Sequence, residues 1–79
     1  MRPIKNKVEL MKEIERILVI LEANRELEKK VNTIDNELND EISCFKDVLE
    51  TLKNGKELND TQFTFITTYS VKLRKIAYN

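Results

Sequence analysis

The chain has a single proline, Pro3, and a single glycine, Gly55, so residues 4–54 contain neither of the residue types that most strongly interrupt a helix. Apolar side chains recur in the first part of this stretch at intervals of three or four positions: Ile4, Val8, Met11, Ile14, Leu18 and Leu21. Because an α-helix has about 3.6 residues per turn, this spacing places them along one side of a helix. Residues 4–31 are therefore predicted to be helical.

A second set of apolar residues at helical spacing follows, out of phase with the first: Leu27, Val31, Ile34, Leu38, Ile42, Phe45, Leu49 and Leu52. A heptad continued from Leu21 would instead place Arg25 and Glu28 in the apolar seam. Such a phase slip fits one long helix in a coiled-coil-like helix pair of a dimer. It also fits two helices, 4–31 and 33–53, that form an antiparallel hairpin. We favour the hairpin, because it buries both apolar sides without a partner chain.

Residues 54–59 are predicted to form a loop between two helices. Asn54 and Gly55 make a helix terminator, since glycine readily adopts the left-handed backbone conformation found just past a helix end. Asn59 is suited to cap the next helix, and Gln62 lies three residues later, where it completes a capping box. These signals predict that a further helix begins near residue 60.

Residues 60–78 allow a helical and an extended interpretation. As a helix, they place Phe63, Ile66 and Leu73 on one apolar face. The same segment also alternates apolar and polar side chains, as a strand does. The capping signals favour the helix, and a lone strand would have no partner in this chain. The predicted fold is all-α, a single domain of residues 1–79 in which a helical hairpin and a third helix form a three-helix bundle, with helices at 4–31, 33–53 and 60–78.

The sequence offers no recognisable site for catalysis, a metal ion or a cofactor. It has no histidine and one cysteine, Cys44, so it lacks the ligands of a zinc site, and it has no Gly-rich phosphate loop. A calcium loop that began at Asp35 would need glycine and glutamate where Asp40 and Lys46 stand. Cys44 is predicted to pack with the second apolar set. We expect a protein that is not an enzyme and binds no cofactor or metal.

The longest apolar run is Ile17–Leu21. It is far shorter than the roughly 20 residues that cross a bilayer, so no membrane partner is expected, and the lone cysteine fits the cytoplasm. Five consecutive residues surround a helix, so either another helix of this chain or a second protein covers them. Both interpretations remain open. The candidate contact residues are Ile17, Val19, Ile20 and Leu21.

The small size of the chain points to association with another protein. In a chain of 79 residues, the free energy gained by burying the core barely exceeds the cost in chain entropy. The sequence provides neither an internal disulfide nor a metal site that would add stability. We therefore expect self-association as a homodimer. The predicted function is that of a helical protein-binding module, an inhibitor, adaptor or regulator of the kind that phages and mobile elements carry, which docks an apolar helix face on a protein partner.

The charges suggest an alternative partner. The chain carries 14 basic and 14 acidic side chains, so it has no overall field that would attract nucleic acid. A basic group near the C-terminus nevertheless could contact a phosphate backbone: Lys72, Arg74 and Lys75. The alternative prediction is therefore a nucleic-acid-binding accessory or transcription-regulatory factor.

Overall fold

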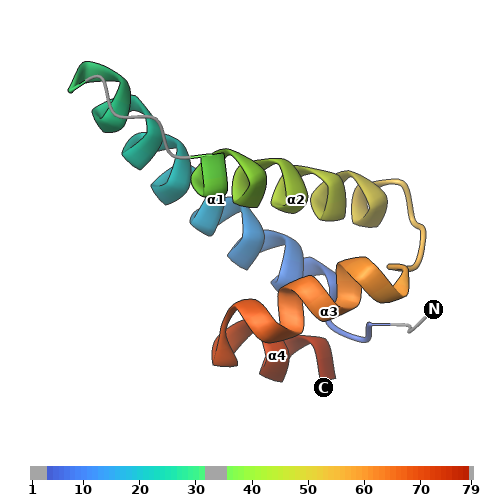
Figure 1. Cartoon of the computed structure of the whole chain (residues 1–79). Coiled ribbons are helices and arrows are strands. Elements are labelled where there is room, and N and C mark those ends of the chain that lie inside the picture. The colour runs from blue at the N-terminus through green and yellow to red at the C-terminus, as the bar shows by residue number, and fades with distance from the viewer. Residues whose placement is uncertain (1–3, 32–35, 79) are drawn as a thin grey trace.

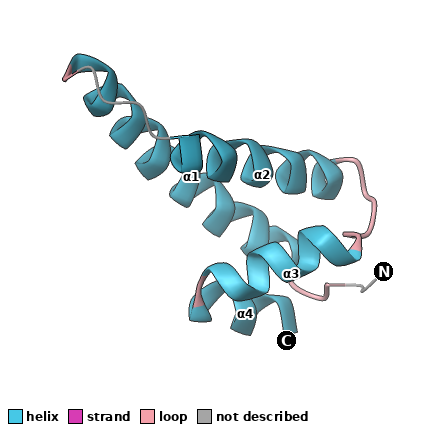
Figure 2. Cartoon of the chain, viewed as in Figure 1, coloured by secondary structure: helices cyan, strands magenta, loops and turns pink. Residues whose placement is uncertain are grey.

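The computed structural model describes residues 4–31 and 36–78. Its helices are α1 (Lys7–Lys30), α2 (Asn36–Lys53), α3 (Asp60–Tyr69) and α4 (Val71–Tyr78). Figure 2 shows these helices, with a loop between α2 and α3 and a short break between α3 and α4. The protein is all-helical, as the sequence predicted. The predicted junction between helices 4–31 and 33–53, with the helix start at residue 33, falls in residues 32–35, which lie outside the described part of the chain.

Helix α1 begins three residues later than the apolar pattern predicted. Ile4 is buried, but it precedes the helix, and the carbonyl of Asn6 accepts the first hydrogen bond from the backbone N–H of Leu10 at 2.9 Å. The charges at the two ends of α1 favour a helix. Glu9 lies in the first turn, and Lys29 and Lys30 lie in the last, where each sign complements the helix dipole.

Helix α2 ends at the predicted glycine. Gly55 has a φ of 74°, a left-handed conformation that glycine adopts without steric cost. The backbone N–H of Gly55 donates to the carbonyl of Leu52 at 3.0 Å, and that of Lys56 donates to the carbonyl of Thr51 at 3.1 Å. These two bonds satisfy carbonyls that would otherwise be left open at the helix end. The predicted terminator is therefore confirmed.

The predicted capping box at the start of α3 is present, and it also connects α3 to α2. Asn59 Oδ1 accepts from the backbone N–H of Gln62 at 2.8 Å, and Gln62 Oε1 accepts from the backbone N–H of Asn59 at 3.0 Å. The amide nitrogen of Gln62 then donates to Asp47 Oδ2 at 2.8 Å and to Thr51 Oγ1 at 3.0 Å. One side chain therefore caps α3 and orients it against α2.

The third predicted helix, residues 60–78, is divided into two at Ser70. Ser70 has extended backbone angles, φ −153° and ψ 156°, and its hydroxyl accepts from the backbone N–H of Leu73 at 3.1 Å, so it begins α4. Just before the break, the hydroxyls of Thr67 and Thr68 donate to carbonyls one turn back, at 2.8 and 2.7 Å. Hydroxyl side chains that bond the backbone compete with regular helix, which explains a break at this position. The described residues therefore form four helices where the sequence predicted three.

The helices pack in a closed ring in which α1 contacts α2, α2 contacts α3, α3 contacts α4, and α4 contacts α1 (Figure 1). Buried side chains from all four helices and from the segments before α1 and α3 form one core: Ile4, Leu10, Ile14, Leu18, Leu21, Leu38, Ile42, Phe45, Val48, Leu52, Leu58, Phe63, Ile66, Leu73, Ile76 and Ala77.

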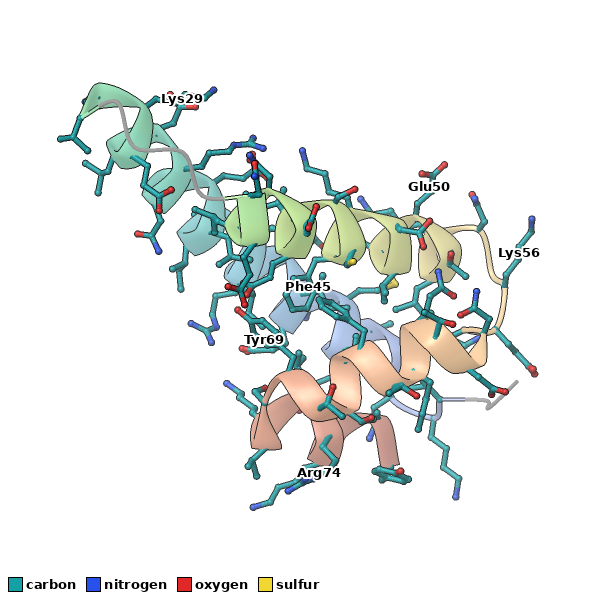
Figure 3. All side chains as sticks on the ribbon, in the orientation of Figure 1. Lys29, Phe45, Glu50, Lys56, Tyr69 and Arg74 are labelled. Carbon is teal, nitrogen blue, oxygen red and sulfur yellow. The ribbon has the colours of Figure 1, made fainter. Side chains whose placement is uncertain are left out.

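Phe45 joins the two halves of this ring. It is fully buried, and its ring meets the rings of Phe65 and Tyr69 edge to face, with centroids 4.8 and 4.7 Å apart. Figure 3 shows Phe45 and Tyr69 facing one another between α2 and α3. The hydroxyl of Tyr69 donates to Glu41 at 3.5 Å, and burial together with the nearby carboxylate raises the pKa of Tyr69.

Two side chains of α2 differ from the prediction. Cys44 was expected to pack in the core but is exposed, whereas Val48, which was not assigned to the apolar set, is buried. Successive helix positions are about 100° apart, so Cys44 lies roughly 100° around the helix from its core neighbour Phe45. Val48 lies one turn beyond Phe45 on the buried side.

The double role of Gln62 gives a testable prediction. Glutamate is normally accepted at this position of a capping box. Here Gln62→Glu removes the donor to Asp47 and places two carboxylates side by side, so we expect a loss of about 1 kcal/mol in unfolding free energy. Urea denaturation followed by circular dichroism measures it.

A second substitution serves as the control for this prediction. Asp47→Asn added to Gln62→Glu removes the repulsion and should recover most of the loss, while Asp47→Asn alone should cost little. Equal urea midpoints for Gln62→Glu and the wild type would show that the contact between α3 and α2 contributes nothing.

Candidate functional site

Helix α1 carries two rows of side chains with different surroundings. One row points into the core: Leu10, Ile14, Leu18 and Leu21. The other row alternates steps of three and four residues from the same leucine: Leu10, Glu13, Ile17, Ile20, Asn24, Leu27 and Val31. Steps of this kind are the heptad pattern that places side chains on one seam of a helix. We call this second row the seam of α1.

The N-terminal half of the seam is covered by α4. Glu13 forms an ion pair with Lys72 across the two helices at 3.2 Å. Around it, a shallow groove is lined by both helices, with Glu9 and Arg16 from α1 and Ile76 from α4. The half-buried side chain of Ile17 also packs against the core.

The C-terminal half of the seam is exposed. The exposed fractions are 47% for Ile20, 61% for Leu27 and 70% for Val31, and Asn24 between them is exposed as well. We name these four residues the distal face. Figure 1 shows the C-terminal end of α1 extending past the start of α2 and away from α3 and α4, and Figure 3 labels Lys29 on this end.

The predicted contact run Ile17–Leu21 is divided between different surroundings. Leu21 is 7% exposed and belongs to the core, and Ile17 is half-buried against it. Only Val19 and Ile20 are exposed, at 71% and 47%. Because consecutive residues are about 100° apart, a five-residue run cannot lie on one surface. Leu21 is therefore removed from the candidate surface.

Val19 lies on another side of α1 from the distal face. It borders a shallow groove between α1 and α2, together with Leu18 of α1 and Leu49 of α2. Lys46 and Glu22 form a long ion pair of 3.9 Å between the same two helices. Val19 is therefore a separate, smaller apolar spot beside the hairpin.

Sequence reasoning did not identify Leu27 and Val31 as contact residues. It assigned both to the second apolar set, as partners of the residues now found in the core of α2. The structure places Leu27 on α1 and Val31 at its C-cap, seven and eleven residues after Ile20. The phase slip after Leu21 therefore marks neither an irregularity in one long coiled-coil helix nor a turn between two helices. It marks the point where the apolar residues of α1 change from the core row to the seam.

Glu13 is the one buried carboxylate among the described residues, and it connects α1 to α4. Its side chain is 5% exposed, and it accepts from Arg16 Nε at 2.7 and 3.1 Å as well as from Lys72. The hydrogen bond from Arg16 has the largest effect on the pKa of Glu13, followed by the opposing effect of burial and then by the contact with Lys72. The result is a lowered pKa, so Glu13 stays ionised.

The three basic candidates for nucleic-acid contact differ in their surroundings. Lys72 is held by the carboxylate of Glu13, so its charge is partly neutralised. Arg74 and Lys75 are exposed on α4 and form no ion pair within the described part of the chain. Figure 3 shows Arg74 pointing away from the bundle.

Neither a metal cluster nor a membrane span is found in residues 4–31 and 36–78. No group of three or more His, Cys, Asp or Glu side chains comes close enough to hold an ion there. None of the helices in these ranges is both long and apolar enough to cross a bilayer. Comparison of the chain with protein-family models, curated proteins and solved structures gives no match.

The ion pairs of Glu13 generate a prediction about stability and pH. Glu13→Gln should lower the unfolding free energy by about 1 kcal/mol at pH 7. The effect stays this small because Arg16 and Lys72 are mostly exposed, so water solvates their charges when the ion pairs with Glu13 are lost. Since the pKa of Glu13 is lowered from its ordinary value of 4.5, its stabilisation is complete above that pH and is lost as the pH falls below it.

The measurement is urea denaturation of both proteins between pH 7 and pH 2.5. The difference in unfolding free energy between wild type and Glu13→Gln should disappear as the pH approaches 2.5. Glu9→Gln, on the same groove but exposed, is the matched control and should change stability by less than about 0.5 kcal/mol. A gap that stays constant with pH would mean that the charge of Glu13 does not hold α4.

Proposed function

We propose that the chain is a non-enzymatic protein-binding module that docks the distal face of α1 on a protein partner. One observation carries the proposal. Three large apolar side chains lie exposed along one row at helical spacing, Ile20 and Leu27 in the C-terminal half of α1 and Val31 at its C-cap. Single exposed apolar residues are common on protein surfaces, but several that are aligned at helical spacing are typical of a binding site.

The projecting geometry supports binding by a helix that enters a groove of the partner. Side chains at positions i, i+7 and i+11 are the anchors that such a helix inserts into an apolar groove. The charged side chains at the edges of the row, Glu28 and Lys30, would remain at the rim. Rim charges set orientation and association rate more than they add affinity.

The mode of action that fits this surface is occlusion or recruitment. The grooves of α1 that we describe are shallow and border solvent, and neither has the concave, desolvated character that acid–base chemistry requires. A small module with one apolar docking face can block a site on its partner, or hold the partner near another protein. An inhibitor, an adaptor and a regulator all act in this way.

A nucleic-acid-binding accessory factor is the second candidate, and the exposure of Arg74 and Lys75 favours it. Such binding would weaken steeply with salt, because each phosphate contact releases counterions. Retardation of DNA or RNA at low salt that disappears in the double variant Arg74→Gln, Lys75→Gln would support this candidate. No retardation at low salt would eliminate it.

The proposed docking face predicts which substitutions abolish partner binding. Leu27→Glu, made in a tagged protein, should reduce the partner recovered from the source cells at least about tenfold, because it places a charge in the centre of an apolar contact. Helicity by circular dichroism should be unchanged, since Leu27 is 61% exposed.

Val8→Glu is the matched control, because Val8 is 64% exposed in the first turn of the same helix and does not belong to the seam. It should recover the partner as well as the wild type. Equal losses for Val8→Glu and Leu27→Glu, or no loss for either, would show that the distal face is not the binding surface.

A further inference from the structure

The seam of α1 changes its surroundings halfway along the helix. At Glu13 the seam is in contact with α4, whereas from Ile20 to Val31 nothing among the described residues buries it. The spacing does not change between the two halves, since steps of three and four residues continue to Val31. The free half therefore continues a helix-packing surface that this chain already uses.

We infer that a second copy of the chain occupies the distal face, with the two α1 helices antiparallel about a two-fold axis. This inference rests on the proposed use of the distal face in binding, and it names the partner. A two-fold contact is self-complementary, so the same surface is used on both copies. Self-association also matches a chain whose core is small for independent stability.

The sequence register supports the antiparallel pairing. In this arrangement Ile20 of one copy lies opposite Val31 of the other, and Asn24 lies opposite Leu27, with the axis between residues 25 and 26. Along the seam, Asn24 and Val31 each follow the preceding seam residue by four positions, whereas Ile20 and Leu27 each follow it by three. Each opposed pair therefore contains one residue of each kind, which is the arrangement in which the side chains of two antiparallel helices interlock. Every apolar residue of the distal face then has a partner.

The position of α4 excludes a parallel pair. In a parallel dimer the two seams would meet along their whole length, and the two α4 helices, which cover the seams near Glu13, would occupy the same space. In the antiparallel pair the free halves overlap from Ile20 to Val31, about 17 Å. Each α4 then lies beyond the end of the other copy's α1.

The residues that flank the seam do not oppose the pairing. Ala23 and Lys30 lie along one edge, and in the antiparallel register each faces the other across the contact. Glu28 lies along the other edge, opposite the buried Leu21. No two like charges come together. The alkyl part of Lys30 can cover Ala23 while its ammonium group stays in water.

The size of the contact predicts a weak dimer. Two helices that touch along three turns form an interface at the low end of specific contacts, near 1,200 Å² in total as an order of magnitude. Asn24 adds a polar group on the seam, which favours a defined register at some cost in affinity. We therefore expect half-dissociation in the micromolar range.

Sedimentation equilibrium of the full chain over a range of concentrations tests the inference. The wild type should change from monomer to dimer. Leu27→Glu should raise the dissociation constant at least about 100-fold, since both copies lose the contact, and Val8→Glu should leave it unchanged. Asn24→Leu should tighten the dimer roughly tenfold, a gain that unfolding could not imitate. A monomer at every concentration, or no response to Leu27→Glu, overturns the inference.

Disulfide trapping in a Cys44→Ser background tests the orientation. A mixture of Ile20→Cys and Val31→Cys proteins should form the mixed disulfide dimer under mild oxidation. Neither protein alone should crosslink, because two copies of residue 20 would be about 17 Å apart along the antiparallel helices, beyond disulfide reach. Crosslinking of Ile20→Cys alone would indicate a parallel pair and overturn the geometry.

The two proposals fail in distinguishable ways. If the chain is monomeric and Leu27→Glu still abolishes capture of a different protein, the proposed function holds and the second copy is not the occupant. If the chain dimerises equally well with and without Leu27→Glu, the distal face is not the dimer contact, and the inference is overturned. If Leu27→Glu affects neither dimerisation nor capture, both proposals are wrong.

Discussion

The arrangement of this protein depends on the packing around Phe45. Its buried ring holds α3 against α2 through Phe65 and Tyr69, and α3 in turn holds α4 against α1. With no disulfide in the chain and no metal cluster in its described part, this apolar contact and the capping box at Gln62 close the ring of helices. Because the ring closes where α4 reaches α1, it also determines how much of α1 is covered. Helix α1 has 24 residues, whereas α3 and α4 have 10 and 8. The uncovered remainder is the distal face.

This mismatch in length explains how one helix can serve both the core and an interface. The core row of α1 ends at Leu21, and beyond it the apolar residues follow the seam on a different side of the helix. Burial of Leu27 and Val31 within the chain would require a longer α4 or a further helix. Where a helix continues its apolar residues beyond the core, these side chains are exposed to water, which costs free energy. That free energy is recovered only when another surface covers them. Glu13 has a complementary role at the other end of the seam, since it holds Lys72 and so keeps α4 on the covered half.

Local signals made much of the fold predictable from the sequence, whereas features set by packing were not. Gly55, Asn59 and Gln62 act through bonds to their own backbone neighbours, so their roles could be read from spacing alone. The break at Ser70 could not be predicted in this way. A serine within a helical pattern interrupts the helix only when tertiary packing favours two helices that run in different directions. The burial of Glu13 could not be predicted from the sequence either. Nothing distinguishes this carboxylate from the many other charged residues until α4 is placed over it. For the proposed binding surface, the sequence analysis had already selected Ile20 of α1, but the change of row after Leu21 was visible only in three dimensions.

Amide hydrogen exchange along α1 tests the central claim, that its distal end is an uncovered helix made to be covered by another protein chain. In dilute solution, the amides of residues 22–30 should exchange faster than those of residues 10–21, because no other helix packs on the seam there. At high protein concentration the exchange of residues 22–30 should slow, while that of α3 should change much less. Slow exchange of residues 22–30 that is equal at both concentrations would contradict the account, since it would mean that the chain itself already covers the distal face.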